Sequence, residues 1–254
     1  MKPCSLPQAF LERPIAHRAL HDGNVSRVEN GIAAIDAAIT AGFGIEIDVQ
    51  PSRDGAAMVF HDYELGRVTT SKGPIAQCTA QELSRVAYVT GEIGIPTLPE
   101  VLARIDGRVP VLIEIKDQDG RMGPNVGALE GAVARVIDEY DGDIAVMSFN
   151  PHSVAAMANL APHIARGLTT CDYQKRDWQL LNDDIRAHLR GIPDFDRVGA
   201  CFISHKAGAL GDQPVLDLKS RGVPILCWTV KSAHIEQKAR EIADSITFEG
   251  YIPA

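Results

Sequence analysis

The sequence predicts a closed α/β barrel of eight parallel strands, the (β/α)8 TIM barrel, with a small insertion between the second strand and the second helix. Its 254 residues are an ordinary length for one such barrel. Short β-rich runs alternate with helical stretches, which is typical of repeated βα units around a parallel sheet. About eight such runs can be marked, the number that a closed barrel needs. We therefore expect a single domain over residues 1–254.

Strands are expected at the β-rich runs, and helices where apolar residues recur every three or four positions between them. One helix is predicted over residues 32–39 and ends near Gly42, since glycine often follows a helix. Others are predicted over residues 98–105 and after the fourth strand. Few residues follow the last strand, so an eighth helix should be short or missing. The strands are predicted at residues 15–19, 44–50, 111–116, 144–149, 164–168, 200–204, 224–230 and 245–249.

Residues 51–95 interrupt this rhythm, because a simple βα loop usually takes only about 2–6 residues. The pair Asp54-Gly55 predicts a hairpin turn between the second strand and a return arm over residues 57–61. The remainder is rich in glycine and predicts a loop-rich lobe. Long loops at the strand-end face of a barrel usually carry function.

Acidic residues occupy alternate positions of the second and third predicted strands. Side chains alternate between the two faces of a strand, so Glu46 and Asp48 point one way and their branched aliphatic neighbours the other. We expect both acids to face the barrel axis near the strand end, where barrel enzymes keep their active sites. Glu114 and Lys116 share a face of the third strand for the same reason. Three carboxylates should therefore converge from neighbouring strands.

This acidic group has two interpretations. Adjacent buried carboxylates repel one another, and a bound cation is the simplest resolution. Ligation by oxygen alone suits Mg²⁺ or Ca²⁺ better than zinc, and Lys116 would then supply positive charge to a phosphate oxygen. Alternatively, lysine or arginine side chains hold the acids in place, with an ion pair between Glu114 and Lys116.

A histidine on the return arm of the hairpin should reach the same axis. Either plausible turn register pairs His61 with Asp48 or with Glu46, and directly opposed residues share a face. Such a histidine can donate or accept a proton beside a metal ion.

His17 and Arg18 end the first strand. Alternation leaves the face of Arg18 undecided between a phosphate contact, to which a planar guanidinium is well suited, and an outer salt bridge. Glu29 and Asn30 open the first helix, where both are ordinary N-terminal residues.

Composition excludes some partners. The formal charge of -8 and the pI near 5.5 argue against general attraction to nucleic acid or to an anionic membrane surface. Five scattered cysteines predict free thiols in a reducing compartment. We find neither a signal-peptide pattern nor a membrane-spanning apolar stretch, and so expect a cytoplasmic protein without stable membrane insertion. The oligomeric state stays open, with a homo-oligomer as one option.

These residues resemble the glycerophosphodiester phosphodiesterase family, of the bacterial cytoplasmic type, across nearly the whole chain. The order and spacing of many short motifs carry the resemblance. They are Ile15-Ala16-His17-Arg18, Glu29-Asn30, Gly44-Ile45-Glu46-Ile47-Asp48-Val49, Asp54-Gly55, His61-Asp62, Arg67-Val68-Thr69-Thr70, Pro96-Thr97-Leu98, Ile113-Glu114-Ile115-Lys116, Ser148-Phe149 and Trp228-Thr229-Val230.

The resemblance implies metal-dependent hydrolysis of a small glycerophosphodiester to an alcohol and glycerol 3-phosphate. It further implies a role for each matching residue: a divalent Mg²⁺ or Ca²⁺ held by Glu46, Asp48 and Glu114, acid/base catalysis by His17 and His61, phosphate contacts from Arg18 and Lys116, a pocket wall from Trp228, and Glu29 near the metal and the substrate hydroxyls. Which histidine is the acid is left open. For Trp228 the alternative is core packing in a buried strand.

Two other functions compete with this one. The first is a lipid-directed activity of the sphingomyelinase D or lysophospholipase D type, and the second is a non-catalytic barrel that binds a phosphodiester. The chain also departs from the family pattern at Ala19, Gly31 and Glu249, where the family usually has His-Arg-Gly, Glu-Asn-Thr and Thr-Asp-x-Pro motifs. These departures leave the metal and histidine positions intact and bear on the choice of leaving group.

Overall fold

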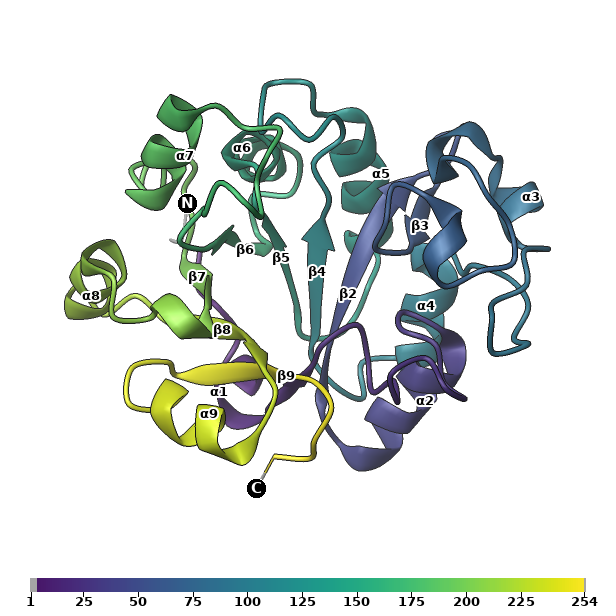
Figure 1. Cartoon of the computed structure of the whole chain (residues 1–254), viewed down its shortest axis with the longest axis horizontal. Coiled ribbons are helices and arrows are strands. Elements are labelled where there is room, and N and C mark those ends of the chain that lie inside the picture. The colour runs from purple at the N-terminus through teal and green to yellow at the C-terminus, as the bar shows by residue number, and fades with distance from the viewer. Residues whose placement is uncertain (1–3, 254) are drawn as a thin grey trace.

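The computed structural model describes residues 4–253, and within them eight parallel strands close into a barrel (Figure 1). Ring closure comes from the first strand, because Ile15 pairs with Gly44 on one side and with Thr247 on the other. The predicted (β/α)8 barrel is thus confirmed. Its strands are β1 (Ile15–Ala16), β2 (Gly44–Pro51), β4 (Val111–Ile115), β5 (Ile144–Ser148), β6 (Ala165–Thr170), β7 (Phe202–Lys206), β8 (Ile225–Val230) and β9 (Ser245–Phe248).

A helix follows every barrel strand except the last within the described residues. Gly42 ends the first of these helices with a φ of 75°, a left-handed conformation that glycine adopts without steric cost. Thr97 and Glu100 form a capping box at the start of the second. The helices are α2 (Ile32–Ala41), α4 (Leu98–Ile105), α5 (Ala128–Ile137), α6 (Pro151–Leu160), α7 (Asp183–Arg190), α8 (Gln213–Ser220) and α9 (Ala233–Ala239).

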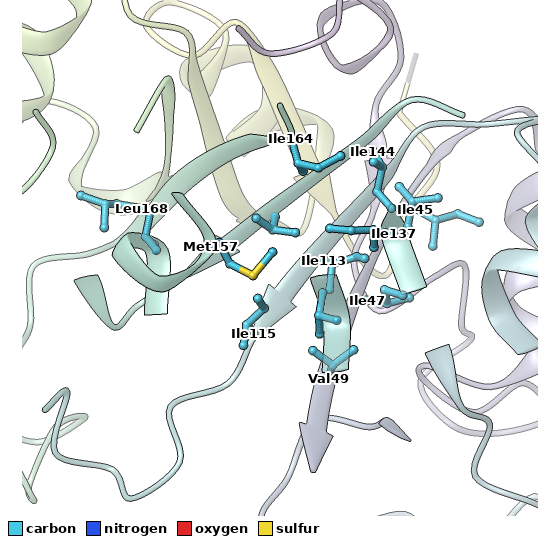
Figure 2. Packing of buried hydrophobic residues seen from close by; sticks show 14 of the residues in the cluster. Ile45, Ile47, Val49, Ile113, Ile115, Ile137, Ile144, Met157, Ile164 and Leu168 are labelled. Atoms are coloured by element: carbon cyan, nitrogen blue, oxygen red, sulfur yellow. The ribbon is translucent and has the colours of Figure 1, made fainter. Parts of the chain in front are cut away.

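The strands bury apolar side chains on both faces. Ile45, Ile47 and Val49 point outward from β2 and pack with Ile113 and Ile115 of β4 beneath the helices (Figure 2). Each such residue contributes about 1.5–3 kcal/mol when fully buried. Within the barrel, a second apolar cluster fills the amino end, where the strands begin. It contains Phe10 from α1 (Ala9–Glu12), Ile15, Leu112, Ala145, Met147, Ala165, Phe202 and Leu226.

The first strand is shorter than predicted. It ends at Ala16 instead of Ala19, because Arg18 and Ala19 adopt positive φ angles of 51° and 64° that turn the chain out of the strand. The backbone N–H of Ala19 instead donates to the carbonyl of Glu46 at 3.0 Å. β6 and β7 begin one or two residues later than predicted and end two residues later.

The insertion follows β2 and forms a small lobe beside the barrel, at the right of Figure 1. It contains β3 (Ala57–Val59), antiparallel to β2, the short helix α3 (Ala80–Leu83), and 3-10 turns at Leu65–Arg67 and Ile75–Gln77. A separate apolar cluster supports the lobe: Val28, Met58, Phe60, Leu65, Val68, Ile75, Leu83, Tyr88 and Ile95.

The hairpin forms, but its register is not the predicted one. Val49 pairs with Val59, and the backbone N–H of Phe60 donates to the carbonyl of Asp48 at 3.0 Å. Phe60 therefore lies opposite Asp48, and the chain leaves the ladder before His61. The prediction that His61 pairs with Asp48 or Glu46 was wrong, because the turn closes through a bond from Ser52 N to Ala56 O and this sets the register.

Among residues 4–253, the helices all lack the length or the apolar character that crossing a bilayer requires.

Candidate functional site

The carboxyl ends of the barrel strands surround a cleft of about 910 Å³, and a smaller recess of about 60 Å³ lies at the barrel axis. His61, Glu114, Lys116, Phe149 and Trp228 line both spaces, so the recess opens into the cleft. All of the predicted site residues except Glu29 line the recess. Its walls are His17, Arg18, Glu46, Asp48, His61, Glu114, Lys116, Met147, Phe149, Trp228 and Thr247.

Three carboxylates converge in the recess as strand alternation predicts. Asp48 of β2 pairs with Glu114 of β4, and Glu46 lies on the same inner face as Asp48. One oxygen from each acid lies within 4.8 Å of the others. Lys116 Nζ lies 2.7 Å from Asp48 Oδ1 and also contacts Glu114 Oε1. The three acids therefore converge, and the Glu114–Lys116 ion pair is present as well. The two arrangements that the sequence offered as alternatives occur together.

Glu46 differs from the other two acids. Its Oε2 accepts the backbone N–H of Arg18 at 2.8 Å, but no lysine or arginine side chain of residues 4–253 forms an ion pair with it. Burial, followed by the charges of Asp48 and Glu114, raises its pKa well above the ordinary value. A buried carboxylate without a cationic partner fits a hard divalent cation, and the three-oxygen donor set suits Mg²⁺ or Ca²⁺.

The left-handed backbone at Arg18 decides which way its side chain points. The guanidinium faces the recess, with Nη1 2.8 Å from Glu29 Oε1 and Nε 3.5 Å from Asp48 Oδ2. The Nε–H group is buried and has no hydrogen-bond partner among the described residues. A buried guanidinium N–H without a partner is a donor suited to an anionic oxygen.

Glu29 lies behind Arg18. Its carboxylate accepts hydrogen bonds from the side chains of Arg18 and Asn24. It also accepts hydrogen bonds from both terminal nitrogens of Arg67, at 2.8 and 2.5 Å. These contacts hold its pKa at about 2, because the arginines and Asn24 outweigh the opposing effect of burial. Glu29 therefore holds the guanidinium of Arg18 in place.

His17 is oriented by a carboxylate that sequence reasoning missed. Its Nδ1 lies 2.7 Å from Glu249 Oε2, and the hydrogen bond with His17 holds the pKa of Glu249 at about 2. Because an ionised carboxylate only accepts, Nδ1 carries the proton and Nε2 is left as the acceptor. Burial lowers the pKa of His17 despite the opposing effect of Glu249. Glu249 stood out in the sequence only as a departure from a motif.

Two side chains, Asp62 and Gln50, hold His61 in place. Its Nδ1 lies 2.6 Å from Asp62 Oδ1, and Arg67 Nε lies 2.6 Å from the other oxygen of that carboxylate. Gln50, the next inward residue of β2 after Asp48, donates to the carbonyl of His61 at 3.0 Å. The alternation that identified Glu46 and Asp48 could also have identified Gln50. Asp62 and Arg67 stood in the sequence motifs without an assigned role.

An aromatic wall borders the cleft. Phe149 lies at its centre, with ring centroids 5.0 Å from Trp178 and 5.4 Å from Trp228. The indole N–H of Trp228 donates to the carbonyl of Ser204 at 3.1 Å, which fixes the ring at the boundary of cleft and recess. The cleft thus offers a broad apolar surface beside the charged recess.

Comparison with known proteins adds an independent observation. A family model described as "Glycerophosphoryl diester phosphodiesterase family" matches residues 17–247. The glycerophosphodiester phosphodiesterase of Bacillus altitudinis is 33% identical over 166 residues, which cover 62% of this chain and 66% of that protein. The putative glycerophosphodiester phosphodiesterase YhdW of Bacillus subtilis (strain 168) is 28% identical over 214 residues, covering 80% of this chain and 81% of the relative.

Among solved structures, an Oleispira antarctica phosphodiesterase in complex with the product sn-glycerol-3-phosphate superposes with a TM-score of 0.76. The match covers 94% of each chain at 24% sequence identity, and at this identity it shows a shared fold.

Proposed function

The chain belongs to the glycerophosphoryl diester phosphodiesterase family, and we propose that it hydrolyses glycerophosphodiesters to an alcohol and glycerol 3-phosphate. One observation carries the proposal. A single recess joins three buried carboxylates, an arginine with a free buried N–H, and two histidines that are each oriented by a carboxylate. Such a recess can bind an anion, hold a cation and move protons on two sides of a phosphorus atom.

Glu46, Asp48 and Glu114 would hold the divalent metal, Mg²⁺ or Ca²⁺. When bound, such an ion supplies positive charge that stabilises the phosphoryl oxygens in the transition state. Lys116 already carries positive charge at this position, because Asp48 and Glu114 outweigh burial and raise its pKa. Lys116 and the Arg18 guanidinium would contact the phosphate oxygens. They give an acidic protein the local positive charge that an anionic substrate needs.

We assign the base to His17 and the acid to His61. His17 has a lowered pKa and an Nε2 free to take a proton from the attacking hydroxyl, which comes from the substrate glycerol or from water. In the first case a cyclic phosphate precedes hydrolysis. His61 lines both recess and cleft, and its Nδ1 lies 2.6 Å from the carboxylate of Asp62, which orients the ring. This position supports the proposal that His61 protonates the alcohol that leaves into the cleft.

The aromatic wall and Glu29 have supporting parts in this proposal. Trp228 would form the pocket wall between the phosphate and the leaving alcohol. Glu29 would act on the substrate through Arg18, whose guanidinium it holds. We also propose that the protein acts in the cytoplasm, in lipid and glycerol metabolism, on small diesters. It would do so as a monomer or a homo-oligomer.

A panel of phosphodiesters tests the proposal, with glycerophosphocholine, a lysolipid and sphingomyelin as substrates. Glycerol 3-phosphate should be released from glycerophosphocholine, lost with chelator, and restored by Mg²⁺ or Ca²⁺. His61→Ala and Glu46→Ala should abolish turnover with the barrel folded by circular dichroism. Preferred cleavage of the lipids would favour the sphingomyelinase D or lysophospholipase D type. Binding without turnover of any diester would favour the non-catalytic barrel, and activity that ignores the chelator would refute the metal assignment.

A further inference from the structure

Two cysteines meet at the opposite end of the barrel from the recess. The sulfur atoms of Cys4 and Cys201 lie 2.8 Å apart, although 197 positions separate the residues in the chain. Even carbon atoms, which are smaller, sit about 3.5–4.0 Å apart when they are in contact without a bond. The backbone thus brings the two thiols closer than an ordinary packing contact.

Both sides of this pair are anchored on the base of the barrel. Cys201 precedes β7, and its backbone N–H donates to the carbonyl of Arg166 in β6 at 2.9 Å. Cys4 belongs to the segment before α1 and packs with Leu6 and Leu11 against the apolar cluster at the strand beginnings. This segment covers the amino end of the barrel, where Phe10 is completely buried. A bond between the thiols would fasten that cover to the sheet.

A buried guanidinium lies beside the pair. Arg166 is 9% exposed, and its side-chain nitrogens donate to the backbone carbonyls of Pro162, Ile164 and Val198. Within residues 4–253 the hydrogen-bond partners of this guanidinium are uncharged carbonyls, so no carboxylate pairs with its positive charge there. A cation next to a thiol favours the thiolate, which is the reactive form of cysteine.

The pKa values of the two thiols are shifted in opposite directions, which gives them different roles in the reaction. The hydrogen bond with Cys201, together with the backbone and charge of Arg166, lowers the pKa of Cys4 to about 6 against the effect of burial. The pKa of Cys201 is raised, first by Cys4 and then by burial. Cys4 is also partly exposed, whereas burial raises the pKa of Cys171 to about 11 and that of Cys227 to about 12. Cys4 is therefore the nucleophile of the pair and Cys201 its partner.

We propose that Cys4 and Cys201 are a modification site, a reversible disulfide that fastens the amino-terminal segment to the base of the barrel. The oxidant is a small disulfide such as glutathione disulfide. The Cys4 thiolate attacks one sulfur of the oxidant, forms a mixed disulfide and releases one glutathione. Cys201 then loses its proton and attacks the Cys4 sulfur, which releases the second glutathione. The protein pair loses two electrons and two protons, and glutathione disulfide becomes two glutathione molecules.

Peptide mapping of the full chain tests the site. Wild type, Cys4→Ser, Cys201→Ser and the matched control Cys78→Ser are equilibrated with glutathione disulfide and digested without reductant. Cys78 is a partly exposed free cysteine in the insertion, far from the pair in sequence. Wild type and Cys78→Ser should each give one cross-linked peptide that joins Cys4 to Cys201 and disappears with dithiothreitol. Cys201→Ser should instead carry glutathione on Cys4.

Thermal unfolding tests whether the disulfide stabilises the attachment of the amino-terminal segment to the barrel. Oxidised wild type should melt roughly 5–15 °C above the reduced protein, since the bond closes a long loop in the unfolded chain. Cys201→Ser should melt at one temperature in both buffers. The proposal is overturned if both thiols of oxidised wild type still react with iodoacetamide, if the cross-link joins other cysteines, or if a mapped Cys4–Cys201 bond leaves the melting temperature unchanged. The wild-type map stands by itself should a serine variant fail to fold.

Discussion

Replacing Glu249 by glutamine should slow turnover about 10–100-fold while the barrel stays folded. The change keeps the size of the side chain and removes its charge. Glutamine can also donate a hydrogen bond to Nδ1 of His17, which would move the ring proton to Nε2. The nitrogen assigned to take a proton from the attacking hydroxyl would then be blocked.

The magnitude follows from the geometry of this contact. Glu249 Oε2 lies 2.7 Å from His17 Nδ1, and the side chains are 24% and 15% exposed. A hydrogen bond to a charged group contributes about 1.5–3 kcal/mol. Each factor of ten in rate corresponds to about 1.4 kcal/mol, so the loss in kcat should lie near one to two orders of magnitude.

The assay is kcat and kcat/KM for glycerophosphocholine as a function of pH. Glu249 raises the pKa of His17, although burial dominates and leaves it lowered. Removal of the charge should lower that pKa further. A base works when deprotonated, so the acidic limb of kcat/KM should move to lower pH in Glu249→Gln. A purely structural role would lower activity without moving this limb.

Lys231 provides the matched control. Its Nζ lies 3.2 Å from the other oxygen of Glu249, and its side chain is 60% exposed. An exposed ion pair contributes about 0–1 kcal/mol, so Lys231→Met should stay within about fivefold of wild type. Glu249→Gln turnover within twofold of wild type, or a rate loss with an unmoved acidic limb, would refute the assignment of His17 as an oriented base.

Three further outcomes are expected. Ala19→Val should lower the free energy of unfolding by about 2–4 kcal/mol, as measured by urea unfolding. The position is buried and has a φ of 64°, so a branched side chain is both strained and overpacked there. The free energy of unfolding of Ala19→Gly should stay within about 1 kcal/mol of wild type. Burial lowers the pKa of His205 to about 4, so its protonation favours the unfolded chain. The contribution of His205 to stability is nearly full at pH 7.5 and should fall by about 2 kcal/mol by pH 5. His205→Gln should lose less stability than wild type over this range by about that amount, as measured by urea unfolding at each pH. Trp178→Ala should raise KM for diesters of bulky alcohols about tenfold and leave kcat nearly unchanged, whereas an equal loss in kcat would place Trp178 in the chemistry.

Strand periodicity predicted the part of the site that depends on local geometry. Glu46, Asp48 and Glu114 face the axis because alternate residues of a strand share a face, and this holds whatever the rest of the chain does. Arg18 could not be placed in the same way. Its direction depends on two successive positive φ angles, at Arg18 and Ala19, and neither residue type signals that conformation.

Contacts between residues far apart in the sequence could not be predicted either. Glu249 meets His17 across 232 positions because β1 and β9 are neighbours in the closed ring. The sequence predicts closure, but it does not predict which residue after β9 faces which residue after β1. The predicted pairing of His61 was wrong for a related reason, since the hairpin register differs by one residue and Phe60 lies opposite Asp48. His61 still lines the recess, because the chain leaves the ladder before it.

The two histidines depend on separate parts of the fold. His17 is oriented by Glu249, so its geometry rests on closure of the ring between β1 and β9. His61 is oriented by Asp62, which Arg67 ties to Glu29 in the barrel, so its geometry rests on docking of the insertion. Glu29 also holds Arg18, which links that docking to the proposed phosphate contact. The insertion therefore positions the proposed acid and the proposed anion-binding arginine together, while the proposed base depends on the barrel. A change that loosens the insertion should weaken substrate binding and alcohol protonation at once, and leave His17 and Glu249 in place.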